Sequence, residues 1–178
     1  MGRMWVDRTP RSANDHARRL RICQSVRRSD VATHVIDCRM LQRAILVFLT
    51  LSGLLVGIWA TLFPRAFYDD FPGFGRVWVA VDGPYNEHLV RDVGQFSLAL
   101  AVATVFAVVT MHALVVRAVA AAWLINAVPH FVHHLRHLDR YDTTDTIGNV
   151  VSLGSLVVLP AAVLMLSIRS AGRSQSRR

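Results

Sequence analysis

The chain has 178 residues, of which 53% are hydrophobic, and a formal net charge of +8. All twenty basic residues are arginine; nine of them precede Met40 and four follow Leu166. This basic charge does not indicate nucleic-acid binding, because no binding motif of that class is present and the middle of the chain is too apolar. The composition instead fits a membrane protein with basic tails.

The first 39 residues form a basic segment that differs from the rest of the chain. Residues 1–39 show neither helical nor strand periodicity, so we expect a disordered arm. This arm has two interpretations: it adheres to anionic lipid head groups, or it lies upstream of a true start at Met40. Cys23 and Cys38 are separated by 14 residues, which matches no metal or redox motif.

Four apolar segments follow, each long enough to cross a bilayer, which takes about 20 residues. We expect the membrane domain to span 40–168, with helices at about 44–63, 87–110, 115–137 and 146–168, followed by a basic tail at 169–178. Gly53 and Gly57 have the spacing that lets another helix approach closely, and we expect that helix to belong to the same chain. Asn86 is suited to cap the second helix.

The connection between the first two helices is rich in aromatic residues, which favour the membrane–water interface. Its rings belong to Phe67, Tyr68, Phe71, Phe74, Trp78 and Tyr85. We expect a short extended piece at 78–81 before a turn at 82–84. The predicted fold is therefore all-α, a four-transmembrane-helix bundle with an aromatic loop over one end.

The distribution of arginine predicts the orientation of the helices. The N-terminal arm, the turn before Arg117 and the C-terminal tail hold most of the arginines, whereas the aromatic loop and the 136–146 loop carry fewer arginines and six of the twelve acids. Both termini are therefore expected to be cytoplasmic, and the aromatic loop extracytoplasmic.

Three of the predicted helices carry a stripe of polar side chains at the end beneath the aromatic loop. The stripes consist of His88, Asp92 and Gln95; of Asn126, His130, His133, His134 and His137; and of Asp145, Asn149 and Ser152. Ionisable groups at membrane depth usually face the interior of a bundle or a wet cavity. We therefore expect an outward-facing polar pocket that the three stripes share.

Several ligands would suit such a pocket. A transition metal could bind His88, Asp92, His130 and His134, because histidine and carboxylate groups at helical spacing are common metal ligands. His88 and His133 could equally ligate a haem or meet a quinone head group. Alternatively, the histidines only donate hydrogen bonds and fix the packing of the helices. No catalytic residue is assigned, because HxxxH differs from the HExxH zinc motif and no general base accompanies it.

Three stretches are together distinctive: residues 67–73 (FYDDFPG), residues 81–94 (VDGPYNEHLVRDVG), and Pro129-His130 followed by His134. They resemble a group of small four-helix membrane proteins of actinobacteria, which are broadly similar to the DoxX-like families. The resemblance covers Met40 to Leu166 and implies the four-helix fold and a plasma-membrane location. Some DoxX-like proteins are small subunits of redox complexes that act on sulfur compounds or quinones.

These observations predict a non-enzymatic accessory protein that binds a small ligand or metal in a membrane redox system. Its expected partners are the lipid bilayer and either a redox protein of the membrane or further copies of the chain. The alternative is a structural or assembly protein. A transporter is disfavoured, because the other halves of the helices, such as 98–109 and 157–166, are nearly all apolar.

Overall fold

The computed structural model of the protein describes residues 38–175, so the predicted basic arm lies almost entirely outside the described residues. The chain divides into Met1–Arg39 and Met40–Arg178, and the described residues belong almost entirely to the second unit.

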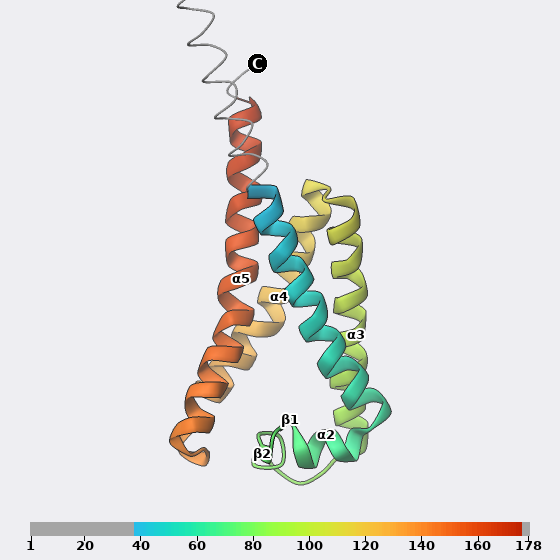
Figure 1. Cartoon of the computed structure of the whole chain (residues 1–178), viewed down its shortest axis with the longest axis vertical. Coiled ribbons are helices and arrows are strands. Elements are labelled where there is room, and N and C mark those ends of the chain that lie inside the picture. The colour runs from blue at the N-terminus through green and yellow to red at the C-terminus, as the bar shows by residue number, and fades with distance from the viewer. Residues whose placement is uncertain (1–37, 176–178) are drawn as a thin grey trace, which may run out of the picture. The chain divides into compact units, whose positions relative to one another are not determined.

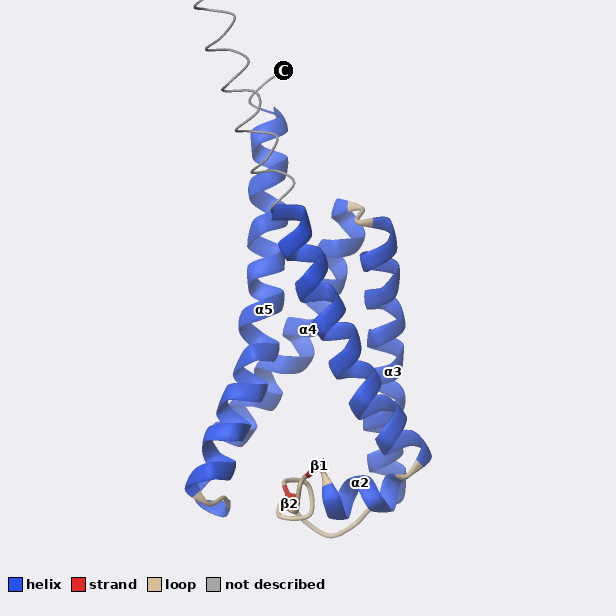
Figure 2. Cartoon of the chain, viewed as in Figure 1, coloured by secondary structure: helices blue, strands red, loops and turns tan. Residues whose placement is uncertain are grey.

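Within the described residues, four helices are long and apolar enough to cross a membrane (Figures 1 and 2). They are α1 (Cys38–Leu62), α3 (Glu87–Thr110), α4 (Ala113–Leu135) and α5 (Thr143–Gln175). Shorter elements connect them: α2 (Pro64–Asp70), β1 (Pro72–Gly73), β2 (Arg76–Val77) and η1 (Leu138–Arg140). The prediction of a helical chain with four candidate membrane spans is confirmed.

Several helix boundaries differ from the sequence prediction: α1 begins at Cys38 rather than 44, α4 ends at Leu135 rather than 137, and α5 continues to Gln175 rather than 168. Two further differences have identifiable reasons. Met111 takes up the left-handed conformation (φ 46°) that closes α3, and α4 then begins at Ala113 rather than 115. Since that conformation favours glycine, the sequence carried no signal for it. At the other boundary, Asp142 accepts a hydrogen bond from the Asp145 amide at 2.7 Å, and α5 begins at Thr143 rather than 146.

The connection between α1 and α3 is more structured than the sequence indicated. Pro64 stands in the first turn of α2, where its missing N–H costs nothing. A two-stranded hairpin follows, with Pro72 paired to Val77 and Gly73 to Arg76. The strand lies at 76–77, and the predicted extended piece at 78–81 forms none.

Aromatic rings attach this connection to α1. The ring centroids of Phe67 and Phe71 are 4.7 Å apart, and the Trp59 ring of α1 lies edge-on to both, at 6.0 and 5.9 Å. The Trp78 ring continues the cluster at 6.2 Å from Phe71. Aromatic pairs at such distances add to the stability that burial provides.

Close approach between α1 and α3 depends on glycine. A Cβ atom at Gly57 would lie 2.7 Å from the Leu98 side chain and 2.9 Å from its amide nitrogen, and one at Gly94 would lie 2.7 Å from the Thr61 nitrogen. A Cβ at Gly53 would lie 3.1 Å from Ala101. The prediction that Gly53 and Gly57 pack within the same chain is confirmed.

The main core lies between α1, α3, α4 and α5. Leu46, Leu49, Ala120 and Val163 are fully buried in it. Three pairs of residues make polar contacts across this region. Gln42 Nε2 donates to the Val163 carbonyl oxygen at 3.4 Å, the Trp123 indole donates to Thr104 Oγ1 at 2.9 Å, and Arg117 donates to Ser167 at 3.0 and 2.7 Å. Figure 1 shows α5 bending part way along its length, and α5 contains Pro160.

Gly57→Ala should destabilise the protein by about 1–3 kcal/mol, because the added methyl group meets both the side chain and the backbone of Leu98. The measurement is thermal unfolding of the detergent-solubilised protein. Gly154→Ala is the matched control, since its nearest atom would lie at 3.6 Å, in ordinary contact. Equal effects of the two substitutions would contradict the proposed steric constraint.

Candidate functional site

Four imidazole rings lie in a row of contacts at the end of α4, three within its last two turns and one just beyond it. We call His130, His133, His134 and His137 the histidine cluster. Ring centroids are 4.7 Å apart for His130 and His134, and 4.4 Å for His133 and His137. His134 is buried, with 8% of its surface exposed, whereas His130 and His133 are exposed. The four histidines of the predicted α4 stripe therefore form one cluster, in which only His134 is buried.

Tyr141, just beyond η1, connects the histidine cluster to the aromatic connection. Its hydroxyl donates to the Trp78 carbonyl oxygen at 3.0 Å and lies 3.4 Å from His134 Nδ1. Burial, together with the nearby Asp82 carboxylate, raises the pKa of Tyr141 from 10.0 to about 12. The hydroxyl therefore stays protonated at physiological pH and acts as a hydrogen-bond donor.

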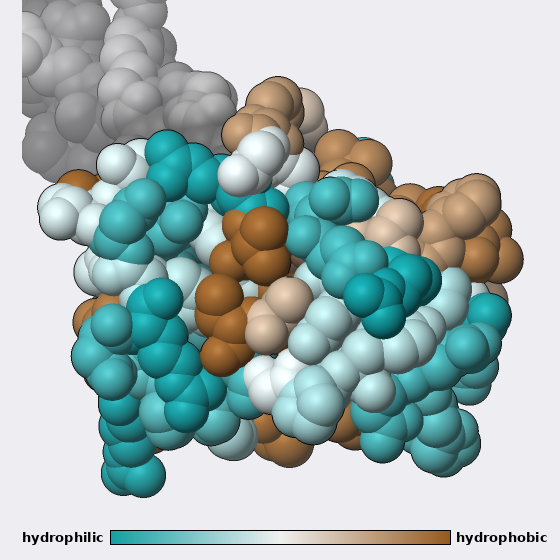
Figure 3. Space-filling view, turned by 90° about the horizontal axis from the view of Figure 1, so that it is seen from below, coloured by the Kyte–Doolittle hydropathy of each residue, from teal (hydrophilic) through white to brown (hydrophobic). Residues whose placement is uncertain are grey.

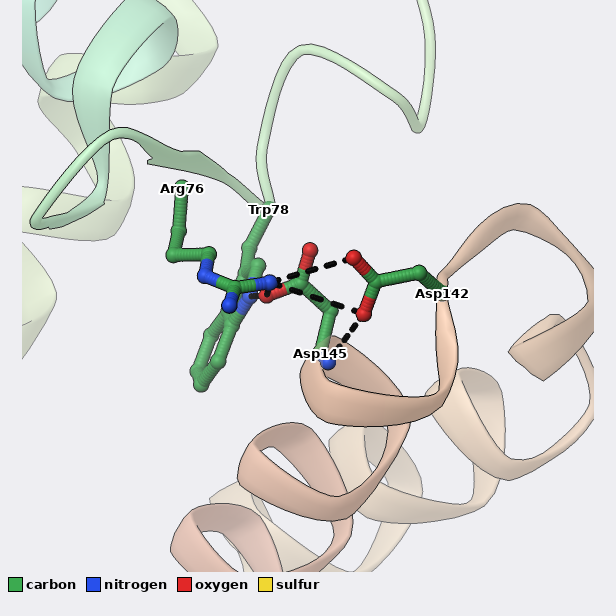
Figure 4. Close-up of polar contacts among 4 residues, drawn as sticks. All are labelled: Arg76, Trp78, Asp142 and Asp145. Atoms are coloured by element: carbon green, nitrogen blue, oxygen red, sulfur yellow. Dashed lines mark hydrogen bonds and ion pairs between the residues drawn. The ribbon is translucent and has the colours of Figure 1, made fainter.

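Asp145 lies at the centre of a network with Arg76, Trp78 and Asp142, the Arg76–Asp145 network (Figure 4). Its Oδ1 accepts from Trp78 Nε1 at 3.0 Å and from Arg76 Nη1 at 3.2 Å. Arg76 also donates to Asp142 Oδ2 at 3.1 Å. The Asp145 side chain is only 15% exposed, so these charge-assisted bonds form partly out of water.

Local sequence explains why this network forms at the start of α5. Gly148 leaves room for the Trp78 ring, since a Cβ there would lie 2.9 Å from it. The pKa of the exposed Asp142 carboxyl is lowered, mainly because the Asp145 amide donates to it. A second ion pair, Arg140 to Asp82 at 3.0 Å, joins the same two segments. Residues 76–82 are thus attached to residues 140–145 at several points.

Figure 3 shows this end of the molecule from below. Hydrophilic residues cover most of the visible face, around a central strip of hydrophobic ones. The hairpin contributes the exposed hydrophobic side chain of Phe74, which has a positive φ of 59° between two glycines.

The predicted α3 stripe is placed differently from that of α4. His88 and Asp92 pair with each other at 3.3 Å, with 89% and 51% of their side chains exposed. Gln95 is exposed as well, and so is Asn126 on α4. These four residues lie on the helix surfaces, where they make contact with water or lipid.

Asn149 on α5 is the most deeply buried of the predicted polar residues, with 1% of its surface exposed. Its side chain interacts with the Tyr141 hydroxyl. Its Oδ1 atom is buried and, among the described residues, has no hydrogen-bond partner. Since a buried acceptor without a partner costs about 1–3 kcal/mol, such an atom marks a position where a donor would bind favourably.

The four predicted metal ligands lie in two pairs, His88 with Asp92 and His130 with His134. Within residues 38–175, no three histidine, cysteine or acidic side chains are arranged to bind one metal ion.

The sequence did not predict Arg76, Asp82, Arg140 and Tyr141 as parts of this region, and Trp78 was expected only at the membrane–water interface. Their contacts join two segments that are 58 to 69 residues apart in the sequence, which periodicity within a helix does not reveal.

The chain was compared with protein-family models, with curated proteins and with solved structures, and none of them matches it.

Asp145→Ala should destabilise the solubilised protein by about 1–3 kcal/mol, because the part-buried Arg76 and Trp78 donors lose their shared acceptor. The same change should speed tryptic cleavage after Arg76, measured by limited proteolysis. Asp139→Ala, an exposed acid in η1, is the control. Unchanged cleavage in Asp145→Ala would show that the network does not hold the 76–82 segment.

Proposed function

We propose that the protein is a multi-pass plasma-membrane protein that binds a small ligand against the histidine cluster, as an accessory component of a membrane redox system. The single observation that carries this proposal is the buried Asn149 Oδ1, which has no donor among the described residues. The Asn149 side chain interacts with the Tyr141 hydroxyl, which in turn lies 3.4 Å from His134 Nδ1. Polar groups at such depth are costly and are commonly found where a ligand or proton is handled.

The ligand class follows from the hydrogen-bonding groups that converge here. Asn149 Oδ1 needs a donor, whereas a neutral imidazole of the histidine cluster can donate to a ligand. A quinol presents hydroxyl donors and a quinone presents carbonyl acceptors, so the head group of a quinone couple suits both kinds of group. A transition metal ion is the less favoured ligand, since no group of three ligating side chains is found among the described residues.

Arginine placement and the resemblance supply the location in this proposal. The arginine-rich termini would be cytoplasmic, and the bundle end that carries the aromatic connection and the histidine cluster would face outwards. The resemblance to DoxX-like proteins of actinobacteria supports the plasma membrane and a redox partner there.

The second candidate is a structural or assembly protein, and the Arg76–Asp145 network favours it. Predicted pocket residues such as Asp145 are already engaged in holding two segments together. In that case the histidine cluster would serve the same purpose, or bind a partner or a further copy of the chain.

The test of ligand binding is quenching of tryptophan fluorescence by a short-chain quinone added to the full-length solubilised protein. His130→Ala combined with His134→Ala should weaken binding at least about tenfold, as expected for loss of about 1.4 kcal/mol or more. Thermal unfolding checks that the double variant is folded. His88→Ala, on the exposed α3 face, should bind like the original chain.

Elemental analysis of the same preparations separates the outcomes. Stoichiometric zinc, copper or iron that is lost in the double variant would replace the quinone proposal with a metal centre. Failure of the original, well-folded chain to bind quinone or metal would favour the structural candidate. A double variant that fails to fold would also favour the structural candidate, provided that Asn149→Leu folds and binds the quinone as well as the original chain does.

Orientation is tested with single cysteines in a chain that carries Cys23→Ser and Cys38→Ser. Phe74→Cys, at the fully exposed tip of the hairpin, should react with a membrane-impermeant maleimide in intact cells. His112→Cys, in the turn between α3 and α4, should react only after permeabilisation. The reverse labelling pattern would invert the proposed topology.

A further inference from the structure

A polar hollow of about 610 Å³ opens where α1 ends and α3 begins. Two arginines, Arg65 and Arg91, line it together with three carboxylates, Asp69, Asp70 and Glu87. Because these residues flank the apolar stretches of α1 and α3, the hollow lies at the boundary between a span and the aqueous phase.

Both arginines are held in position by neighbouring groups. Arg65 Nε donates to Asp69 at 2.6 Å, and its guanidinium lies 4.9 Å from the centre of the Tyr85 ring. Arg91 Nε donates to Glu87 at 2.9 Å, and its Nη1 donates to the Thr61 carbonyl. A guanidinium has five N–H donors, so these hydrogen bonds leave others for a bound oxyanion.

Asp70 differs from the other two carboxylates. Asp69 and Glu87 each pair with an arginine, whereas Asp70 is exposed and has no ion pair with any described residue. Two guanidinium groups and three carboxylates give the hollow a formal charge of −1. That balance favours an occupant that carries a cation besides its anion.

An apolar hollow of about 430 Å³ continues from the same place along α1. Its lining consists of Leu51, Leu54, Leu55, Ile58, Trp59 and Phe63, and Phe63 also lines the polar hollow. Twelve residues of helix rise about 18 Å, at ~1.5 Å per residue. Half of a hydrocarbon core of ~30 Å is about 15 Å, so the apolar hollow matches the depth of one leaflet.

We propose that the two hollows bind one zwitterionic phospholipid whose head group carries an ammonium. The phosphodiester accepts hydrogen bonds from Arg65 and Arg91, the ammonium pairs with Asp70, and one acyl chain lies along α1 between Leu51 and Phe63. The site shares no residue with the histidine cluster, so it stands independently of the function proposed above.

The test is native mass spectrometry of the full chain, released from nanodiscs that contain equal amounts of phosphatidylethanolamine and phosphatidylglycerol. We expect the chain to retain phosphatidylethanolamine at least about fivefold more often than phosphatidylglycerol. Asp70→Asn should bring this ratio close to one, because it removes only the partner of the ammonium. Leu55→Trp should fill the apolar hollow and reduce retention of both lipids together.

Asp139→Asn is the matched control, since it neutralises another exposed acid elsewhere at the same end of the molecule. Equal retention of the two lipids by the original chain would overturn the proposal, as would equal effects of Asp70→Asn and Asp139→Asn. Preferred retention of phosphatidylglycerol would also overturn it. Because Asp70 and Leu55 are both exposed, neither substitution depends on repacking the core.

Discussion

The shared acceptor Asp145 Oδ1 determines how the end of the molecule with the histidines is organised. It receives the Trp78 indole and the Arg76 guanidinium, both from the connection between α1 and α3, although it belongs to α5. With the connection held there, the Trp78 carbonyl is placed to accept the Tyr141 hydroxyl, which in turn lies beside His134. One part-buried carboxylate therefore positions the groups that surround the histidine cluster, and charge-assisted bonds of this kind are worth about 1.5–3 kcal/mol each.

The membrane-spanning part relies on shape rather than charge. Gly53, Gly57 and Gly94 bring α1 and α3 close together, as expected in lipid, where apolar side chains gain little by leaving their surroundings. Side-chain pairs that join one span to another include Thr104 with Trp123, and Arg117 with Ser167. The four spans can therefore present apolar surfaces to lipid while their directions are fixed by steric fit.

Sequence periodicity and composition predicted the four spans, the Asn86 cap and the close packing at Gly53 and Gly57. The signal for each of these lies within a single helix, in its length, its N-cap residue or the spacing of its glycines. The contacts of Arg76 and Tyr141 could not be predicted this way, since they join loops distant in sequence. Helical phase grouped the α4 histidines correctly. It could not establish that His88 and Asp92 lie on the side of α3 that does not pack against other helices. Helical phase orders residues around a helix without fixing which side packs.

The sequence separation within the Arg76–Asp145 network has a consequence for biosynthesis. Arg76 and Trp78 emerge from the ribosome about seventy residues before Asp145, so α1 and α3 can pair through their glycines while the hairpin still lacks its acceptor. The connection must wait for the insertion of α4 and the first turn of α5. Synthesis of the first turn of the last span is thus the event that completes the Arg76–Asp145 network. A chain that stalls before it would expose unpaired cationic and aromatic groups to quality-control proteases.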